Sequence, residues 1–94
     1  LGGKIYAAGG IRLSSVEAFD PQTNSWAEVA PMSTARGDFT LTAVRDKLYA
    51  VGGSGGRTTL ATVEAYDPQQ DRWEARAPMP EVRRGHGAAA VFFL

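Results

Sequence analysis

Arginine is the residue type in this 94-residue sequence whose placement most clearly predicts binding chemistry. Five arginines stand in segments rich in glycine, serine and proline, which are typical of surface loops. A guanidinium group presents a planar fork of donors that matches a carboxylate, so such residues predict recognition of an acidic group. The five candidates are Arg12, Arg36, Arg57, Arg83 and Arg84.

Catalytic and metal-binding groups are scarce in comparison. The sequence contains one histidine, His86, and no cysteine, so neither a nucleophile–histidine set nor a thiolate metal site can be assembled from it. His86 stands beside a predicted strand, between two glycines, and we interpret it as a structural or solvated residue. We therefore expect no catalytic residues, no cofactor and no metal.

Net charge and the length of apolar runs also argue against certain classes of protein. Ten basic and ten acidic residues give a formal net charge of zero, which argues against a generally basic nucleic-acid-binding protein but not against a local basic patch. No apolar run approaches the roughly 18 residues of a membrane-spanning helix. The sequence indicates no compartment, and the cytoplasm is only the default.

The elements that position the arginines come from a repeat. Residues 63–79, VEAYDPQQDRWEARAPM, match residues 16–32, VEAFDPQTNSWAEVAPM, at ten of seventeen positions with an offset of 47. Upstream, residues 47–53 match residues 4–10 with an offset of 43, so the loop between the two matches is four residues longer in the second copy. A fixed period of this length predicts repeated units that bury their cores against one another.

Within each copy, alternating apolar and polar residues predict strands, and no convincing helix is found. Arg45-Asp46 predicts a two-residue hairpin turn. Asp20 and Asp67 each precede a proline and are expected to bond the backbone two residues further on. The predicted strands are 4–9, 16–19, 26–30, 39–44, 47–52, 63–67, 73–77 and 87–93.

Each copy has a tyrosine three residues before a glycine pair, an aromatic residue before Asp-Pro, a tryptophan six residues after that aspartate, and a Pro-Met ending. This pattern resembles the kelch repeat, over essentially the whole chain. The large aromatic residues are interpreted as packing groups between neighbouring units. The residues that carry the motif are Tyr6, Gly9, Gly10, Asp20, Trp26, Tyr49, Gly52, Gly53, Asp67 and Trp73.

The resemblance implies an all-β chain, residues 1–94, made of two kelch-type β-propeller blades of four antiparallel strands each, cut in a staggered frame. In the family's strand order, residues 39–77 form a complete blade. Residues 4–30 form a split blade, whose innermost strand, equivalent to 87–93, comes from a neighbouring copy or a longer chain. Kelch propellers commonly have six blades, so we expect either a head-to-tail trimer or a piece of a longer propeller.

In a meander of strands the loops 10–15, 33–38, 53–62 and 80–86 share one face, which holds all five arginines. The resemblance adds that an arginine just before the innermost strand lies on the ligand face of peptide-binding kelch domains, a position that Arg36 and Arg83 match. The first hypothesis is a non-catalytic protein-interaction module that binds an acidic peptide or protein segment on this face. No nucleic acid or membrane partner is expected.

Three alternatives remain open at this point. Any single arginine is better explained as solvating its loop or pairing with a local acid, and only the five together favour binding. A second hypothesis is a self-assembling, excised or engineered propeller scaffold without an evolved ligand. A third is a fragment of an enzyme whose site lies on other blades; the copper-radical oxidases that share this fold need a cysteine and several histidines.

Overall fold

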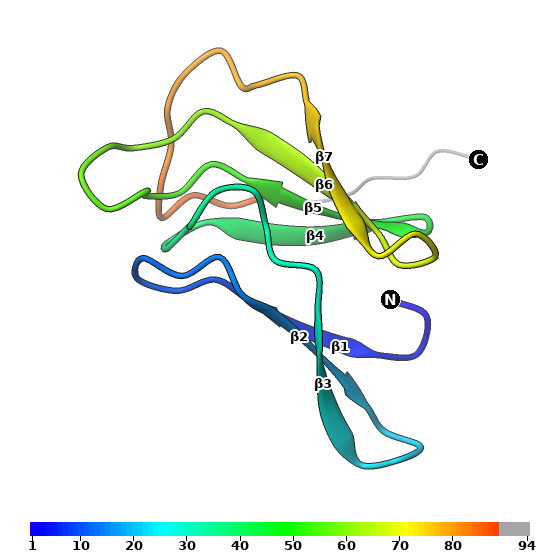
Figure 1. The fold of residues 1–94 in the computed structure, drawn as a ribbon. Coiled ribbons are helices and arrows are strands. Elements are labelled where there is room, and N and C mark those ends of the chain that lie inside the picture. Colours follow the sequence, from blue (N-terminus) through cyan, green and yellow to red (C-terminus); the bar gives the residue numbers. More distant parts are fainter. Residues whose placement is uncertain (89–94) are drawn as a thin grey trace.

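Residues 1–88 are described by the computed structural model, in which they form two antiparallel sheets that lie face to face, with no helix (Figure 1). The first sheet has the strand order β1 (Ile5–Ala8), β2 (Val16–Asp20), β3 (Ser25–Val29). The second has the order β4 (Thr40–Val44), β5 (Lys47–Val51), β6 (Val63–Asp67), β7 (Arg72–Arg76). The expected all-β class with meandering antiparallel sheets is confirmed.

The seven strands agree with the predicted ranges to within one residue at each end. Val44 pairs directly with Lys47, as a two-residue hairpin at Arg45-Asp46 requires. The expected strand at 87–93 falls mostly on residues 89–94, outside the described part of the chain. The division into a complete and a split blade, and the closure of a ring, stay predictions.

The two Asp-Pro turns form as their sequence predicts. The Oδ1 atom of Asp20 accepts a hydrogen bond from the backbone N–H of Gln22 at 2.9 Å, and Asp67 accepts one from Gln69 at the same distance. Later in each turn, Asn24 and Asp71 adopt φ angles of 55° and 51°. Among non-glycine residues, asparagine and aspartate tolerate this left-handed region best, so the turns carry little strain.

The hydrophobic core lies between the two sheets. Alternate residues of β2, Val16 and Ala18, point toward the second sheet and are buried. Ala50 of β5 and Met32, which follows β3, complete the core with Val16. Further side chains that pack against this core are Tyr6, Ala8, Val29, Phe39, Leu41 and Trp73.

Each glycine pair lets a connecting segment cross close above the end of a strand. Gly9 has a φ of 69°, and a Cβ atom there would lie 2.5 Å from the carbonyl oxygen of Arg36. Gly52 has a φ of 65°, and its Cβ would lie 2.6 Å from the carbonyl oxygen of Arg83. Glycine is therefore required at both positions by backbone conformation and by space.

Candidate interaction surfaces

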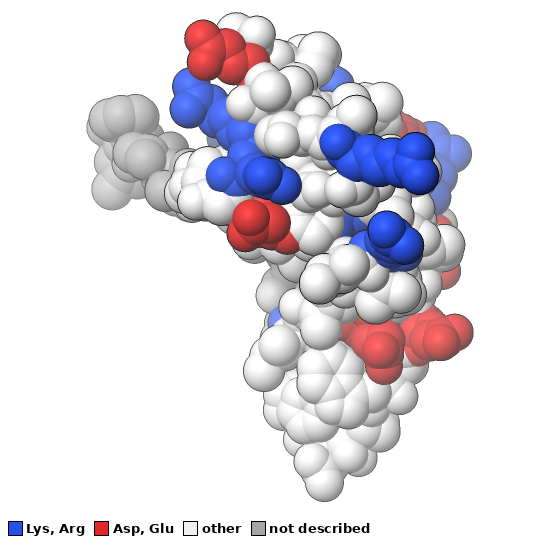
Figure 2. Space-filling view, turned by 90° about the vertical axis from the view of Figure 1, so that its left-hand side faces the viewer, with Lys and Arg blue, Asp and Glu red and all other residues white. Residues whose placement is uncertain are grey.

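The loops that were expected on one face do lie together, at one end of both sheets (Figure 1). The Asp-Pro turns and the Arg45-Asp46 hairpin lie at the opposite end. Figure 2 looks onto the loop end and shows its basic side chains in separate groups with uncharged surface between them. Any binding site on this face is therefore built from a few arginines at a time.

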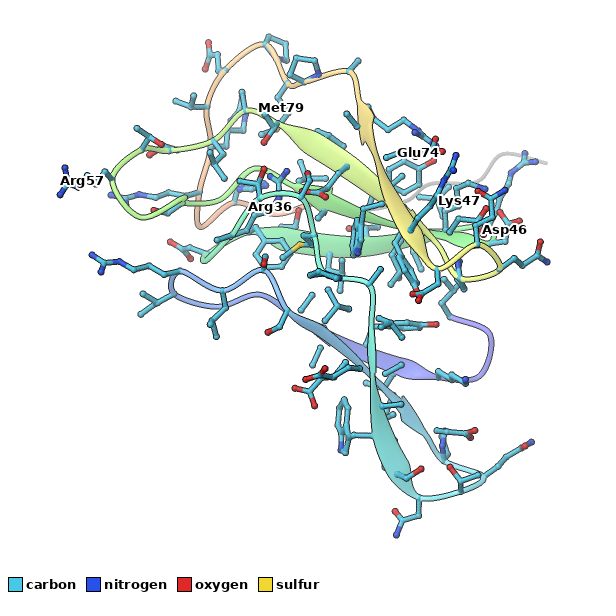
Figure 3. The ribbon with its side chains drawn as sticks, in the orientation of Figure 1. Arg36, Asp46, Lys47, Arg57, Glu74 and Met79 are labelled. Atoms are coloured by element: carbon cyan, nitrogen blue, oxygen red, sulfur yellow. The ribbon has the colours of Figure 1, made fainter. Side chains whose placement is uncertain are left out.

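Arg36 does not belong to this exposed set, although its position in the sequence predicts a ligand-facing residue. The residue is 1% exposed. Its Nε and Nη2 atoms donate to Oε2 of Glu64 at 3.2 and 3.0 Å, and Nη1 donates to the carbonyl oxygens of Gly52 and Thr62 at 2.8 and 2.9 Å. The structure therefore places this arginine in the interior, with its guanidinium group bonded within the chain (Figure 3).

Glu64, the partner of Arg36, is a residue that sequence reasoning missed. It lies on β6, is 1% exposed, and points toward the first sheet. Its other oxygen, Oε1, accepts hydrogen bonds from the backbone N–H and the hydroxyl of Ser33 at 2.8 and 3.0 Å. The pair thus fastens the segment that leaves the first sheet onto the second sheet.

The other four arginines are exposed. Arg83 lies 3.9 Å from the carboxylate of Glu81 in a surface pair, a geometry that contributes little free energy. Arg57 projects from the tip of the long loop (Figure 3). Arg12, Arg57 and Arg84 form no ion pair with any residue in 1–88.

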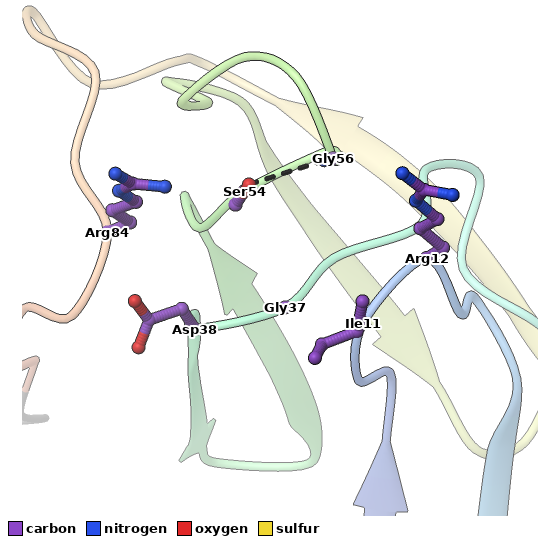
Figure 4. A pocket seen from close by; sticks show the side chains of 7 residues that line it. All are labelled: Ile11, Arg12, Gly37, Asp38, Ser54, Gly56 and Arg84. Atoms are coloured by element: carbon purple, nitrogen blue, oxygen red, sulfur yellow. Dashed lines mark hydrogen bonds between the residues drawn. The ribbon is translucent and has the colours of Figure 1, made fainter.

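Arg12 and Arg84 line the same hollow, which has a volume of about 500 Å³. Figure 4 shows their guanidinium groups on opposite sides, with the Ser54 hydroxyl between them and the Asp38 carboxylate below Arg84. The floor and rim also include Ile11, Gly37 and Gly56. Residues 72 positions apart in the sequence thus meet at one site.

The backbone around this hollow is held in place by hydrogen bonds. Gly37 and Ser54 exchange backbone bonds of 2.9 and 2.7 Å, and Gly85 donates to the carbonyl oxygen of Asp38 at 2.9 Å. Arg12 and Asp38 adopt φ angles of 59° and 55°, in a region that costs most residues about 1–2 kcal/mol. The bond from Gly85 holds Asp38 directly, and the backbone N–H of Leu13, next to Arg12, donates to the carbonyl oxygen of Gly10 at 3.2 Å.

On the other side of the core, an aromatic and polar cluster joins the sheets. Trp73 donates its indole N–H to the carbonyl oxygen of Ala30 at 2.9 Å and packs against the core. Asp71 accepts bonds from the backbone N–H of Ala30 and the hydroxyl of Tyr66, and these bonds, in that order, lower the pKa of Asp71. Burial, together with Asp71, raises the pKa of the Tyr66 hydroxyl, and the ring of Tyr6 lies 5.9 Å away. We interpret this cluster as one that holds the two sheets together.

A second surface is the outer flank, which we define as the face of the first sheet directed away from the second sheet. Ile5 and Trp26 of this flank are 59% and 52% exposed. Glu17 and Glu28 stand directly opposite each other on neighbouring strands and are also exposed. The remaining members of the outer flank are Ala7 and Phe19.

His86 occupies a packing position. A Cβ atom on Gly52 would meet its ring at 3.0 Å, just as one on Gly9 would meet the ring of Phe39 at 2.7 Å. The two rings therefore play the same part in the two repeats. Within residues 1–88, no group of three or more acidic or histidine side chains is arranged to hold a metal, and no helix could cross a lipid bilayer.

Comparison with known proteins adds a family and several relatives. The family profile described as Kelch motif matches residues 1–33 and 35–80. The Influenza virus NS1A-binding protein homolog of Xenopus laevis is 44% identical over 62 residues, which cover 62% of this chain and 10% of that protein. Human Kelch-like protein 6 is 42% identical over 57 residues, 56% of this chain and 9% of the relative. Human Kelch-like protein 7 is 48% identical over 44 residues, 47% of this chain and 8% of the relative. These matches span about a tenth of each relative.

Proposed function

The chain belongs to the kelch repeat family, and we propose that it is a non-catalytic protein-interaction module that binds an acidic segment of a partner at the hollow between Arg12 and Arg84. Kelch-repeat relatives are protein-interaction modules, and one is named for binding influenza virus NS1A. The proposal is carried by two exposed guanidinium groups on opposite sides of one hollow, neither of which pairs with an acid in residues 1–88.

The chemistry of the hollow favours a carboxylate-bearing ligand. A hydrogen bond between a guanidinium group and a carboxylate contributes about 1.5–3 kcal/mol, more than a neutral bond. Ile11, which is 87% exposed, adds an apolar contact at the rim. The volume of about 500 Å³ lies within the usual range for small ligand sites, so it accommodates one or two side chains of a partner segment.

Asp38 makes the two sides of the hollow unequal. Its carboxylate lies on the side of Arg84 and partly offsets the positive charge there, whereas no acid stands beside Arg12 among the lining residues. We therefore expect Arg12 to contribute more to binding an acidic group than Arg84. The buried Arg36 makes no direct contact in this proposal.

The proposal is tested with a fluorescently labelled peptide rich in glutamate, compared with the same peptide carrying glutamine, by fluorescence anisotropy. Arg12→Ala is expected to weaken binding of the glutamate peptide by about tenfold or more, through loss of a charge-assisted contact. Arg57→Ala is the matched control, because it removes an exposed loop arginine outside the hollow. Equal losses in the two variants, or equal binding of both peptides, would overturn the proposal.

Asp38→Asn provides a test in the opposite direction. It removes the acid that faces the ligand while keeping the size of the side chain, so binding of the glutamate peptide should become several-fold tighter. Raising the salt concentration should reduce this gain, because ions screen exposed charges. A variant that binds no better than the parent would show that the carboxylate of the ligand does not enter the hollow.

The second candidate function, a self-assembling scaffold without an evolved ligand, is favoured by a different observation, the exposed outer flank. An apolar sheet face with unpaired edges favours association with a further sheet. Three copies would supply the six blades common in kelch propellers. Sedimentation velocity across a range of concentrations tests this candidate: a species of about three chains is expected, and a monomer at every concentration would exclude it.

A further inference from the structure

The bonds that join the two sheets involve residues that recur 47 positions away in the sequence, where no such bonds form within residues 1–88. Arg36 pairs with Glu64, and an offset of 47 residues takes these two positions to Arg83 and Glu17. Trp73 donates to the carbonyl oxygen of Ala30, and the same relation takes these positions to Trp26 and Ala77. Each bond inside the chain therefore predicts a bond between one flank of this chain and the opposite flank of another unit.

The residues at the equivalent positions are exposed. Trp26 is 52% exposed, and the side chain of Arg83 is 56% exposed. Glu17 is exposed and pairs with no described cation, and it lies opposite Glu28, where two like charges repel each other. The outer flank thus combines an apolar surface with two neighbouring glutamates, and a cation beside them would reduce their mutual repulsion.

From these observations we propose that the outer flank of the first sheet receives a second copy of this chain, with Arg83 of one copy beside Glu17 of the next. Trp26 of the receiving copy then donates its indole N–H to the carbonyl oxygen of Ala77. The contact joins different flanks and so runs head to tail, which allows a ring to close. The inference rests on the self-assembling form of the proposed function and adds the residues that set its register.

The junction differs from the internal contact in ways that make it weaker. Ser33, which donates two hydrogen bonds to Glu64, is replaced at the equivalent position by Pro80, which has no backbone N–H. Glu17 therefore depends on Arg83 more completely than Glu64 depends on Arg36. A charge reversal at this pair should accordingly affect assembly more than any other surface change.

The test uses sedimentation velocity of the full chain and five charge variants. Glu17→Arg or Arg83→Glu alone places like charges together and should weaken association about 30-fold or more. The double variant Glu17→Arg with Arg83→Glu restores opposite charges and should recover most of the association. Asp46→Arg and Arg57→Glu are matched controls, because they make the same charge changes at exposed sites away from the outer flank and should leave association unchanged.

The possible outcomes separate the inference from the function on which it rests. An assembly that tolerates both single reversals, or that the double variant fails to recover, overturns the proposed register and leaves self-assembly standing. A parent chain that stays monomeric overturns both. Urea unfolding of each variant under monomeric conditions checks folding, and Trp26 should become protected from acrylamide quenching only in the assembled state.

Discussion

The same flank of the two sheets is buried in one and exposed in the other. In the second sheet, Leu48 and Tyr66 are 5% and 2% exposed, because the first sheet covers them. In the first sheet the equivalent positions hold Ile5 and Phe19, and Ile5 is 59% exposed. Nearly the same sequence therefore gives a core surface or an open surface, depending only on whether another unit lies beside it.

The comparison also predicts that stability is uneven along the chain. Within residues 1–88, the second sheet has four strands and a covered flank, whereas the first has three strands and an open one. Segments with fewer buried apolar contacts open at lower free-energy cost. Hydrogen exchange of the chain as a monomer should therefore be faster in β1 and β3 than in β5 and β6.

The largest expected difference in the free energy of unfolding is between variants of the two equivalent arginines, Arg36 and Arg83. Arg36→Ala removes one member of a buried ion pair and a hydrogen-bond donor to the carbonyl groups of Gly52 and Thr62, so the free energy of unfolding should fall by about 3–5 kcal/mol. Arg83→Ala, the matched variant at an exposed arginine, should cost less than about 1 kcal/mol in the monomer. Urea unfolding measures both. Similar costs would mean that the ion pair does not hold the sheets together.

An intermediate effect is expected at the tryptophans. Trp73→Phe removes the hydrogen bond to Ala30 and leaves that carbonyl group without its partner, which should cost about 1–3 kcal/mol. Trp26→Phe should change the monomer by no more than about 0.5 kcal/mol, because the ring is half exposed and donates to no described residue. The remaining tryptophan in each variant reports exposure: fluorescence should be quenched by acrylamide more readily when Trp26 remains than when Trp73 remains.

The smallest expected effect concerns acid. The pKa of Asp71 is lowered in the folded state, first by the N–H of Ala30 and then by the Tyr66 hydroxyl. Its stabilising effect is therefore present above its ordinary pKa of 3.8 and is lost as the pH falls through the lower, folded value. Asp71→Asn should remove this part of the acid sensitivity in urea titrations between pH 5 and 2.

The first sheet supplies the control for the acid effect. Asn24 occupies the position of Asp71 on the open flank. Asn24→Asp should add no comparable acid sensitivity to the monomer, since no neighbouring sheet supplies an N–H there and Phe19 stands in place of Tyr66 without a hydroxyl. Equal changes in acid sensitivity from the two substitutions would show that the turn itself, and not the bonds from Ala30 and Tyr66, lowers the pKa.

The sequence predicted local features correctly and missed features that depend on residues far apart in the chain. Strand ranges and the Asp20 and Asp67 turns follow from alternation and residue type within a few positions, and the structure confirms them. The prediction that Arg36 lies exposed on the loop face was wrong. This loop arginine is buried because it pairs with an acid far along the chain. Glu64 lies 28 residues away and on a strand whose other residues gave no sign of a charge partner.

A signal for that pair was nevertheless present. A glutamate recurs at the same position of β2 and β6, and an arginine recurs 47 residues apart after β3 and β7. Two charges of opposite sign that repeat together indicate a repeated ion pair. The hollow between Arg12 and Arg84 had no such signal, because its shape depends on how four separate loops pack.

The difference between the two long loops has a consequence for stoichiometry. Ser54 and Gly56 of the second loop line the hollow, and the equivalent positions of the first loop, at an offset of 43, hold Ile11 and Leu13. In a ring of identical copies, the hollow within each chain would therefore differ from the one at each boundary between chains. A titration should then reach saturation at one acidic segment per chain, half the number of blades.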